Sequence, residues 1–400
     1  VINNDYKGIY ILFEKIKRDK NRVNIKKLEP TDITGDALTG GYIIKIDKWT
    51  GSGNDGWYSG YLPYSNAWQR ISYQYHIPKP EDIVSQQKTY IQNYITNFES
   101  KMYLNSFNNP DSGYTKFIDL SSFVDMFLIN EMSKNVDGYR LSTFMYKDRS
   151  SISDKLVMGP IWDYNLAFGN ADYYEGGLLT GWMLDYLTTN YSFLNSDGAV
   201  VPFWWKKLKE DTYFQNQVKT RWENIKLKGI KFEWFNSKID SLVVYLNESQ
   251  QRNFQRWPVL GVYVWPNAYI GQSYTDEILY LKSWIRDRLT WVNNNLPGQV
   301  VSVDREVLPN EFSLKQNYPN PFNPSTTISF SLADKCYISL EIFNQIGQKI
   351  QTVYEGEMNI GTYNYVIDMN GYSTGVYFYT LNISTGNQKM KQTKKMVLVK

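Results

Sequence analysis

The pattern of apolar residues changes near residue 297, and this change constrains the fold more than any other feature of the sequence. Before it, long amphipathic segments rich in tryptophan predict helices, whereas after it short alternating segments between turn residues predict strands. A chain of 400 residues also exceeds what one hydrophobic core usually holds. We therefore expect an α+β domain over residues 1–296, a linker over residues 297–312 and a small all-β sandwich over residues 313–400.

The composition excludes several classes of function. With 42% hydrophobic and 16% aromatic residues the chain is globular, and a net charge of +3 is too small for the concentrated basic surface of a protein that binds nucleic acid. The single cysteine, Cys336, excludes an intrachain disulfide and a cysteine-based zinc cluster. A Ser-His-Asp triad would depend on His76 alone, which sits in a segment typical of a loop before a helix. No apolar run approaches the ~20 residues that cross a bilayer, so we expect no membrane-spanning segment.

The first 50 residues predict β structure. The segments GIYILFEKI and GGYIIKID both alternate apolar and polar positions after glycine. The chain opens without Met or a signal peptide, already inside what looks like a strand pair. We therefore expect it to be incomplete at the N-terminus, with the signal peptide in the missing part.

Helical spacing follows. PEDIVSQQKTYIQNYITNFESKMY predicts one helix, with Glu81 and Asp82 in its first turn, where they suit the positive end of the helix dipole. DLSSFVDMFLINEMSKN predicts a second helix. Two short strands, STFMYKD and KLVMGPIWD, come next.

Residues 200–295 predict mostly helices that are rich in tryptophan. At helical spacing, aromatic residues such as Trp284 belong to the core more often than to a surface that stacks on sugars. The stretch RWPVLGVYVWPN is the one that we expect to line a surface groove.

Two carboxylates, Asp137 and Asp163, form a candidate catalytic pair. Asp137 lies between the second helix and a strand, and Asp163 stands in an apolar, glycine-punctuated run that reads as core. Adjacent strands joined by a turn would bring both to the same end of a sheet. Together with Lys45 on a separate sheet, they suit phosphoryl transfer, which needs a carboxylate for Mg²⁺, another to orient the attacking hydroxyl and a cation for the phosphates.

Each of these residues also has a purely structural interpretation. Asp137 in NVDG can be a turn residue, and Asp163 can cap a strand-to-loop turn. Lys45 can be a surface lysine on an alternating strand. The spacing alone leaves both interpretations open.

A resemblance favours the catalytic interpretation. The segments YKGIYILFEKIKRDKNRVNI, GGYIIKID, NVDGYRLSTFMYKD and GPIWDYNLAFGN together resemble the CotH family of spore-coat-type kinases, over residues 1 to about 295. The resemblance implies an atypical protein-kinase-like fold of two lobes, with an N-lobe remnant over residues 1–100 and a helical C-lobe over residues 101–296. It also implies transfer of phosphate from ATP, with Mg²⁺ or Mn²⁺, to hydroxyls of secreted or surface proteins.

The same resemblance implies roles for individual residues. Asp137 corresponds to the catalytic-loop aspartate of kinases. Asp163, Tyr164 and Asn165 occupy the place of the magnesium-binding Asp-Phe-Gly, so Asp163 and Asn165 are the expected metal ligands. Lys45 corresponds to the lysine that meets the nucleotide phosphates.

Glu99 and Ser142 complete the expected nucleotide site, and both raise alternatives. Glu99 is expected to be the helix partner of Lys45, unless it is a solvated helix residue. Ser142 stands where ordinary kinases have a metal-binding asparagine, and Asn165 stands where they have glycine. No glycine-rich nucleotide loop is visible either. These departures leave open a second class of function, a catalytically silent surface protein that binds or supports a partner.

The last 90 residues resemble the type A sorting domain of the type IX secretion system. FSLKQNYPNPFNPSTTISFSL, ISLEIFNQIGQKI, GVYFYTL and TKKMVLVK agree with it in order, and Asn344 to Gly347 predicts a hairpin turn. The resemblance implies that the export machinery of Bacteroidetes-type bacteria recognises residues 313–400, and that the protein is secreted or displayed on the cell surface. An ordinary sandwich domain that binds a partner or carbohydrate is the alternative.

Overall fold

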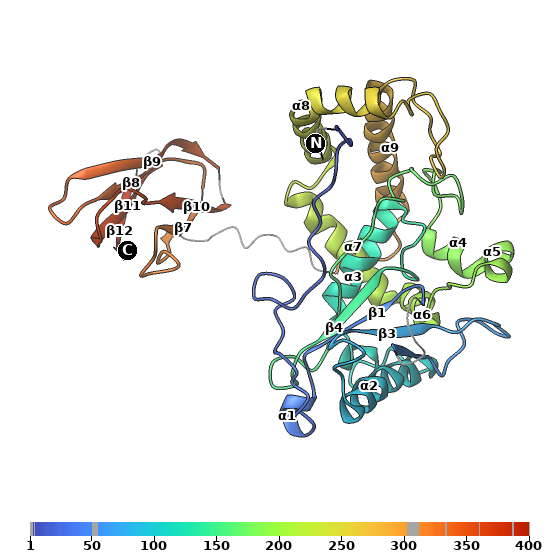
Figure 1. Ribbon diagram of the computed structural model, residues 1–400. Helices are drawn as coiled ribbons and strands as arrows, with labels where there is room; N and C mark the ends of the chain where they lie inside the picture. The colour runs from blue at the N-terminus through green and yellow to red at the C-terminus, as the bar shows by residue number, and fades with distance from the viewer. Residues whose placement is uncertain are drawn as a thin grey trace. The chain divides into compact units, whose positions relative to one another are not determined.

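The computed structural model describes residues 3, 5–49, 55–301, 312–332, 334–359, 361–385 and 388–399. The chain divides into two compact units, Val1–Val303 and Asp304–Lys400 (Figure 1). Most of the linker that the sequence predicts over residues 297–312 lies outside the described residues. Within the described residues, no helix is long and apolar enough to cross a membrane.

The first unit contains a five-stranded antiparallel sheet in the order β2-β3-β1-β4-β5. Its strands are β1 (Tyr42–Ile46), β2 (Gly56–Tyr58), β3 (Ser72–Ile77), β4 (Thr143–Lys147) and β5 (Leu156–Met158). The central pairing joins β1 to β4 across a long stretch of sequence. Strands from before and after residue 100 therefore share one sheet, and the expected division into lobes does not coincide with a break in it.

Each face of this sheet packs against a different part of the chain, because successive residues of a strand point to opposite sides. Ile44 and Met145 belong to the main core, together with the apolar sides of α2 (Ser85–Tyr103) and α3 (Leu120–Ser133). Ile43 and Phe144 point the other way and pack against Val23 and Ile25 of the N-terminal region.

The first unit contains further helices besides α2 and α3 (Figure 1). They are α1 (Gly35–Leu38), η1 (Tyr114–Lys116), α4 (Met183–Thr189), α5 (Tyr191–Ser196), α6 (Phe203–Glu210), α7 (Thr212–Leu227), α8 (Phe232–Arg256) and α9 (Tyr274–Asn295). Trp204, Trp205 and Trp284 are buried, which confirms the prediction that the helical tryptophans are core residues. The stretch RWPVLGVYVWPN is different, since Trp257 and Trp265 are exposed.

Three local expectations were wrong. GIYILFEKI is not a strand; no strand of the described chain pairs with it, and its residues 9–13 are exposed. Helix α2 begins at Ser85, so Glu81 and Asp82 precede it rather than forming its first turn. Strand β5 ends at Met158 and does not reach Asp163, because Gly159 has a φ of +122° and Pro160 lacks an N–H to continue the ladder.

The second unit is an antiparallel β-sandwich. One sheet has the order β10-β7-β6 and the other has the order β12-β11-β8-β9. The strands are β6 (Ser313–Leu314), β7 (Ser325–Leu332), β8 (Cys336–Phe343), β9 (Lys349–Met358), β10 (Gly361–Asp368), β11 (Gly375–Thr385) and β12 (Gln388–Leu398). Residues of both sheets, such as Phe330 and Leu340, form one core. The predicted turn is confirmed, since Asn344 N–H donates to Gln348 O at 3.0 Å and Gly347 has a φ of +79°.

Candidate active site

Asp137 lies in the turn that follows α3, and a buried arginine holds its side chain. Arg140 Nη2 donates to Asp137 Oδ1 at 2.8 Å, and the arginine side chain is only 3% exposed. The Asn135 side chain accepts the Asp137 N–H at 3.1 Å, which fixes the backbone. Burial raises the pKa of Asp137, whereas the charges of Arg140 and Lys48 lower it. The carboxylate is thus fixed in orientation and remains partly open to solvent.

Arg140 also joins Asp137 to a second carboxylate, Asp197. Arg140 Nη1 donates to Asp197 Oδ2 at 3.1 Å, and the Tyr174 hydroxyl donates to the same oxygen at 2.8 Å. Two further donors of the guanidinium reach the carbonyl oxygens of Val136 and Ala199, each at 3.0 Å. The planar guanidinium of Arg140 is therefore fixed by several hydrogen bonds, and it fixes the orientation of the Asp137 carboxylate in turn.

Asp163 is exposed, with a left-handed backbone at φ +64°. The expectation that its apolar surroundings form core holds only in part, because Met158 and Ala167 are buried whereas Ile161 is exposed. The charge of Asp163 raises the pKa of Asp137, so the two carboxylates lie within electrostatic range of each other. A left-handed conformation costs a non-glycine residue roughly 1–2 kcal/mol, so the rest of the fold must impose it.

Other non-glycine residues with left-handed backbones gather in the same part of the chain. Between residues 134 and 175 they are Lys134, Tyr139, Ser142, Asp163, Phe168, Tyr174 and Glu175. Conformational strain of this kind is concentrated at functional sites, where geometry matters more than local stability. Ser142, with φ +48° and partial burial, belongs to this strained group.

Contacts with α3 fix the two loops that carry the carboxylates. The Tyr164 hydroxyl donates to Asn130 Oδ1 at 2.7 Å, so the residue after Asp163 is tied to α3. Gly138, the residue after Asp137, lies so close to Asn130 that a Cβ would stand 2.9 Å from its side chain. Asn165 is exposed, and its carbonyl accepts a hydrogen bond from the Asn170 side chain at 2.8 Å.

Lys45 and Glu99 do not form the expected ion pair. Lys45 Nζ instead lies 3.0 Å from Asp47 Oδ2. In the sheet Lys45 stands opposite Gln74, whereas Glu99 accepts a hydrogen bond from the Tyr73 hydroxyl at 2.9 Å. Tyr73 and Gln74 are neighbours on β3 and point to opposite faces, so Lys45 and Glu99 lie on opposite faces of the sheet.

Glu99 is not a solvated helix residue either. It is 1% exposed, and its carboxylate accepts hydrogen bonds from the hydroxyls of Ser59 and Tyr73, each at 2.9 Å. No positively charged group contributes to its pKa, and burial raises the pKa of Glu99 to about 7. The folded protein therefore holds this carboxyl in its neutral form more readily than the unfolded chain does.

This raised pKa predicts how Glu99→Gln changes stability with pH. Glu99 stabilises the fold fully below its ordinary pKa of 4.5, and this contribution is lost as the pH rises through about 7. Glutamine stays neutral, so the variant gains up to about 3 kcal/mol over the wild type between pH 5 and pH 8. Urea unfolding at both pH values measures the difference. The control, exposed Glu81→Gln, should show no such pH dependence, and an equal effect of Glu99→Gln at both pH values would contradict the prediction.

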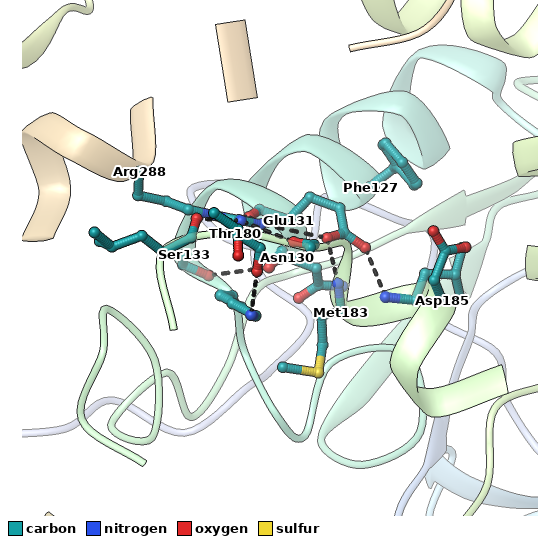
Figure 2. Close-up of polar contacts among 12 residues, drawn as sticks. Phe127, Asn130, Glu131, Ser133, Thr180, Met183, Asp185 and Arg288 are labelled. Carbon is teal, nitrogen blue, oxygen red and sulfur yellow. Dashed lines mark hydrogen bonds and ion pairs between the residues drawn. The ribbon is translucent and has the colours of Figure 1, made fainter. Parts of the chain in front are cut away.

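A buried network anchors the end of α3 that leads into the Asp137 loop. Figure 2 shows Arg288 reaching from α9 to Glu131 near the end of α3, with Nη2 2.6 Å from Glu131 O. At the last helical turn, Lys134 Nζ donates to Thr180 O at 2.5 Å, and burial lowers the pKa of Lys134 to about 8. The network joins the segment after Asp163 to the segment before Asp137.

A cavity of about 410 Å³ opens beside the Asp163 loop. It lies between an N-terminal segment, residues 14–23, and the edge formed by β4 and β5. Its apolar walls include Ile16, Met158 and Trp162, and Trp162 directly precedes Asp163. Several charged side chains also line it: Glu14, Lys15, Lys17 and Arg22.

The residues fit one mode of metal binding and not another. Within the described chain no group of three or more His, Cys, Asp or Glu side chains could hold a metal ion by itself. Mg²⁺ bound to nucleotides usually takes only one or two protein carboxylates, and phosphates and water complete its shell. Exposed Asp163, within electrostatic range of Asp137, suits such a shared ion, and these residues do not suit a dedicated metal centre.

Sequence reasoning missed three charged residues around Asp137. Arg140 could have been found from the sequence, because it is a positive charge three residues after Asp137. Lys48 was overlooked because the resemblance pointed to Lys45 as the lysine of the site. No sequence pattern links Asp197 to Asp137, because only the tertiary fold brings the two residues together.

Comparisons with known proteins identify both units. A family described as CotH kinase protein matches residues 1–292, and one described as secretion system C-terminal sorting domain matches residues 316–399. The sorting domain indicates type IX export, either to the cell surface or into the medium. No curated protein matches the chain significantly.

Solved structures add no argument about the fold. The dimeric latent PorU of Porphyromonas gingivalis is 16% identical, with a TM-score of 0.20, over 26% of this chain and 10% of that one. An endo-beta-1,4-mannanase from Thermotoga petrophila is 10% identical, with a TM-score of 0.17, over 34% of this chain and 27% of that one. The family matches are the informative result, and since the first of them spans well over half of the chain, the protein belongs to the CotH kinase family and carries a C-terminal sorting domain for secretion.

Proposed function

We propose that the protein is an exported kinase that transfers phosphate from ATP to hydroxyl groups of surface or secreted proteins. The observation that carries this proposal is the pairing of Asp137, held by buried Arg140, with exposed Asp163 inside its electrostatic range. Family membership supports a kinase-like activity of the first unit. The sorting domain supports acceptors outside the cell.

In this proposal Asp137 orients the acceptor hydroxyl and takes its proton. Arg140 keeps the carboxylate in place and favours its ionised form. Asp163 would hold Mg²⁺ or Mn²⁺, with Asn165 or Ser142 as neutral oxygen ligands. When bound, the metal ion would neutralise charge on the phosphates of ATP.

The cavity beside Trp162 is the proposed place of the nucleotide base. Its apolar walls suit a planar ring. Because Trp162 lines the cavity and directly precedes Asp163, the phosphates of a nucleotide bound there would extend toward Asp163. Lys45 points to the sheet face of Ile43 and Phe144, and Tyr146, two residues after Phe144 on β4, lines the cavity on that same face. Lys45 is therefore the proposed cation for the phosphates, although Glu99 cannot be its partner.

The test is transfer of labelled phosphate from ATP, with Mg²⁺ or Mn²⁺, to the protein itself or to a generic acceptor. We expect labelling by the wild type and a loss of at least about a hundredfold in Asp163→Ala, because the variant lacks the metal carboxylate. The control is Asp111→Ala, an exposed aspartate that precedes the N-terminus of α3, whereas Asp137 follows its C-terminus. Equal labelling by Asp163→Ala and the wild type would contradict the assignment of Asp163.

A catalytically silent surface protein is the second candidate function. Ser142 and Asn165 favour it, since neither is the residue that ordinary kinases use at these places. No labelling, together with no shift of the melting temperature by ATP and Mg²⁺, would support this candidate over the kinase.

A further inference from the structure

The loop between α8 and α9 exposes a run of large apolar side chains. Residues 257–265, WPVLGVYVW, contain no charged side chain. Most of their large side chains are exposed, and Trp265 is 69% exposed. The exposed members are Trp257, Val259, Val262, Tyr263, Val264 and Trp265. So many exposed apolar side chains in one short segment are typical of a surface that binds a partner.

Backbone contacts hold this loop in one conformation. Gly261 N–H donates to Gly271 O at 2.8 Å, which ties the middle of the loop to the segment before α9. Ala268 N–H donates to Asn170 O, and Asp172 N–H donates to Pro266 O, both at 2.9 Å. The exposed surface is therefore formed in advance, and a partner that docks on it does not have to order it.

A chain of contacts connects Trp265 to the candidate catalytic carboxylate. The Trp265 ring stacks on Tyr173, with centroids 6.0 Å apart and planes inclined by 6°. Tyr173 packs edge-on against Tyr174, with centroids 4.9 Å apart, and the Tyr174 hydroxyl reaches Asp197. Asp197 shares Arg140 with Asp137.

The pKa of Tyr173 also reflects the nearby carboxylates of the candidate active site. Burial raises the pKa of Tyr173 to about 12, and the charge of Asp137 contributes to the shift, ahead of Asp197 and Asp172. Tyr173, on which Trp265 stacks, therefore lies within electrostatic range of Asp137.

We propose that the loop 257–265 is the docking surface for the acceptor protein, and that it binds an apolar or aromatic side chain located a few residues from the acceptor hydroxyl. The proposal rests on the proposed kinase function and adds to it the specificity for the acceptor. Charged groups lie at the margins of the loop, where Arg256 packs over the Trp257 ring and Asp172 accepts the Tyr263 hydroxyl, whereas Trp265, 69% exposed, offers a large apolar contact. An extended acceptor segment lying across Tyr173 would present its hydroxyl to Asp137 and its apolar side chain to Trp265.

The test uses the 400-residue chain and a library of serine peptides in which each position near the serine is varied in turn. We expect the wild type to prefer Phe, Leu or Trp at one fixed distance from the serine. Trp265→Ala should lose this preference through a rise of about tenfold in KM for the preferred peptide, with kcat unchanged. Trp265→Phe should keep part of it.

Matched variants separate docking from folding and from catalysis. Trp234→Ala removes an exposed tryptophan on α8 and should leave the peptide preference intact. Val264→Asp leaves the stack of Trp265 on Tyr173 in place and adds a charge to the surface, so it should also raise KM. Self-labelling from ATP without peptide reports the catalytic site independently and should be equal in all four variants.

Three outcomes would overturn the proposal. The first is self-labelling without any peptide preference, or with a preference for basic residues that Trp265→Ala leaves unchanged. Either result rejects the docking surface but is consistent with the kinase. The second is retention by a polysaccharide matrix that depends on Trp265, with no effect on peptides, which assigns the loop to carbohydrate. The third is the absence of any labelling and of any nucleotide binding, which rejects the kinase and the docking surface together.

Discussion

Replacing Arg288 by methionine is expected to destabilise the first unit by about 3–5 kcal/mol, because the change leaves a buried carboxylate without its cation. Arg288 is fully buried and pairs with Glu131, which is also fully buried, at 3.7 Å. Burial lowers the pKa of Arg288 to about 10 and raises that of Glu131. Both charges therefore depend on the network around them (Figure 2).

The hydrogen bonds of this network explain the size of the effect. Arg288 Nη1 donates to the carbonyl oxygens of Leu179 and Gly181, each at 2.8 Å, and Nε and Nη2 donate to Glu131 O. The Glu131 carboxylate accepts the N–H groups of Met183 and Leu184, each at 2.8 Å. Methionine fills a similar volume but donates nothing, so the carbonyl oxygens of Leu179 and Gly181 lose this donor in the interior, and that of Glu131 retains the Lys134 N–H at 3.3 Å.

Urea unfolding followed by tryptophan fluorescence measures this loss. The control is Arg286→Met on the same helix, where the arginine is exposed and pairs with the adjacent Asp287, so we expect a change of at most about 0.5 kcal/mol. Adding Glu131→Gln to Arg288→Met should restore part of the stability, since it removes the buried charge while the amide oxygen still accepts one of the two N–H groups. A loss below about 1 kcal/mol in Arg288→Met would show that the network contributes little.

Local patterns predicted much of this fold. The 3.6-residue period located α2, α3 and the helices of residues 200–295, and alternation located most strands of the sandwich. Strand β9 is an edge strand whose side chains are only partly buried on either face, so its sequence does not alternate clearly. The segment GIYILFEKI alternates well, but a strand also needs a partner, and the pattern of one segment contains no information about its neighbour.

The candidate site was predictable only where its chemistry is local. The motifs around Asp137 and Asp163 were visible, and the structure brings the two charges within range. The alternation of β1 also showed that Lys45 and Ile44 point to opposite faces. Which of those faces α2 covers is a tertiary property, and this is why Glu99 was wrongly assigned to Lys45.

Arg140→Met is expected to lower kcat about a hundredfold while the KM for ATP changes little, because the substitution frees the carboxylate of Asp137 from its fixed orientation. Arg140 does not itself meet the substrate in this proposal; it positions Asp137 and keeps it ionised. Burial raises the pKa of Asp137, and Arg140 is the largest influence that lowers it. Without Arg140 that pKa rises further, so the carboxylate needs a higher pH to accept a proton.

The pH dependence of the rate distinguishes this role from a merely structural one. A base must be ionised to act, so the acidic limb of the profile of kcat against pH should move to higher pH in Arg140→Met. Arg140→Lys keeps the charge and loses the fork, so it should restore the position of the limb but only part of the rate. Asp137→Asn has no ionisable group at this position, so its kcat should be about a thousandfold or more below that of the wild type at every pH.

Since Arg140 is buried, folding must be measured beside activity. Thermal melting of Arg140→Met shows whether the variant retains the wild-type structure. Asp197→Asn provides an independent variant, because it removes the other carboxylate on Arg140 and leaves the 2.8 Å contact with Asp137 in place. With one negative charge fewer near Asp137, its pKa should fall, and the acidic limb should move to lower pH, opposite to Arg140→Met. If both variants fold and both leave the limb where the wild type has it, Asp137 is not the group that titrates, and the assignment of the catalytic base must be abandoned.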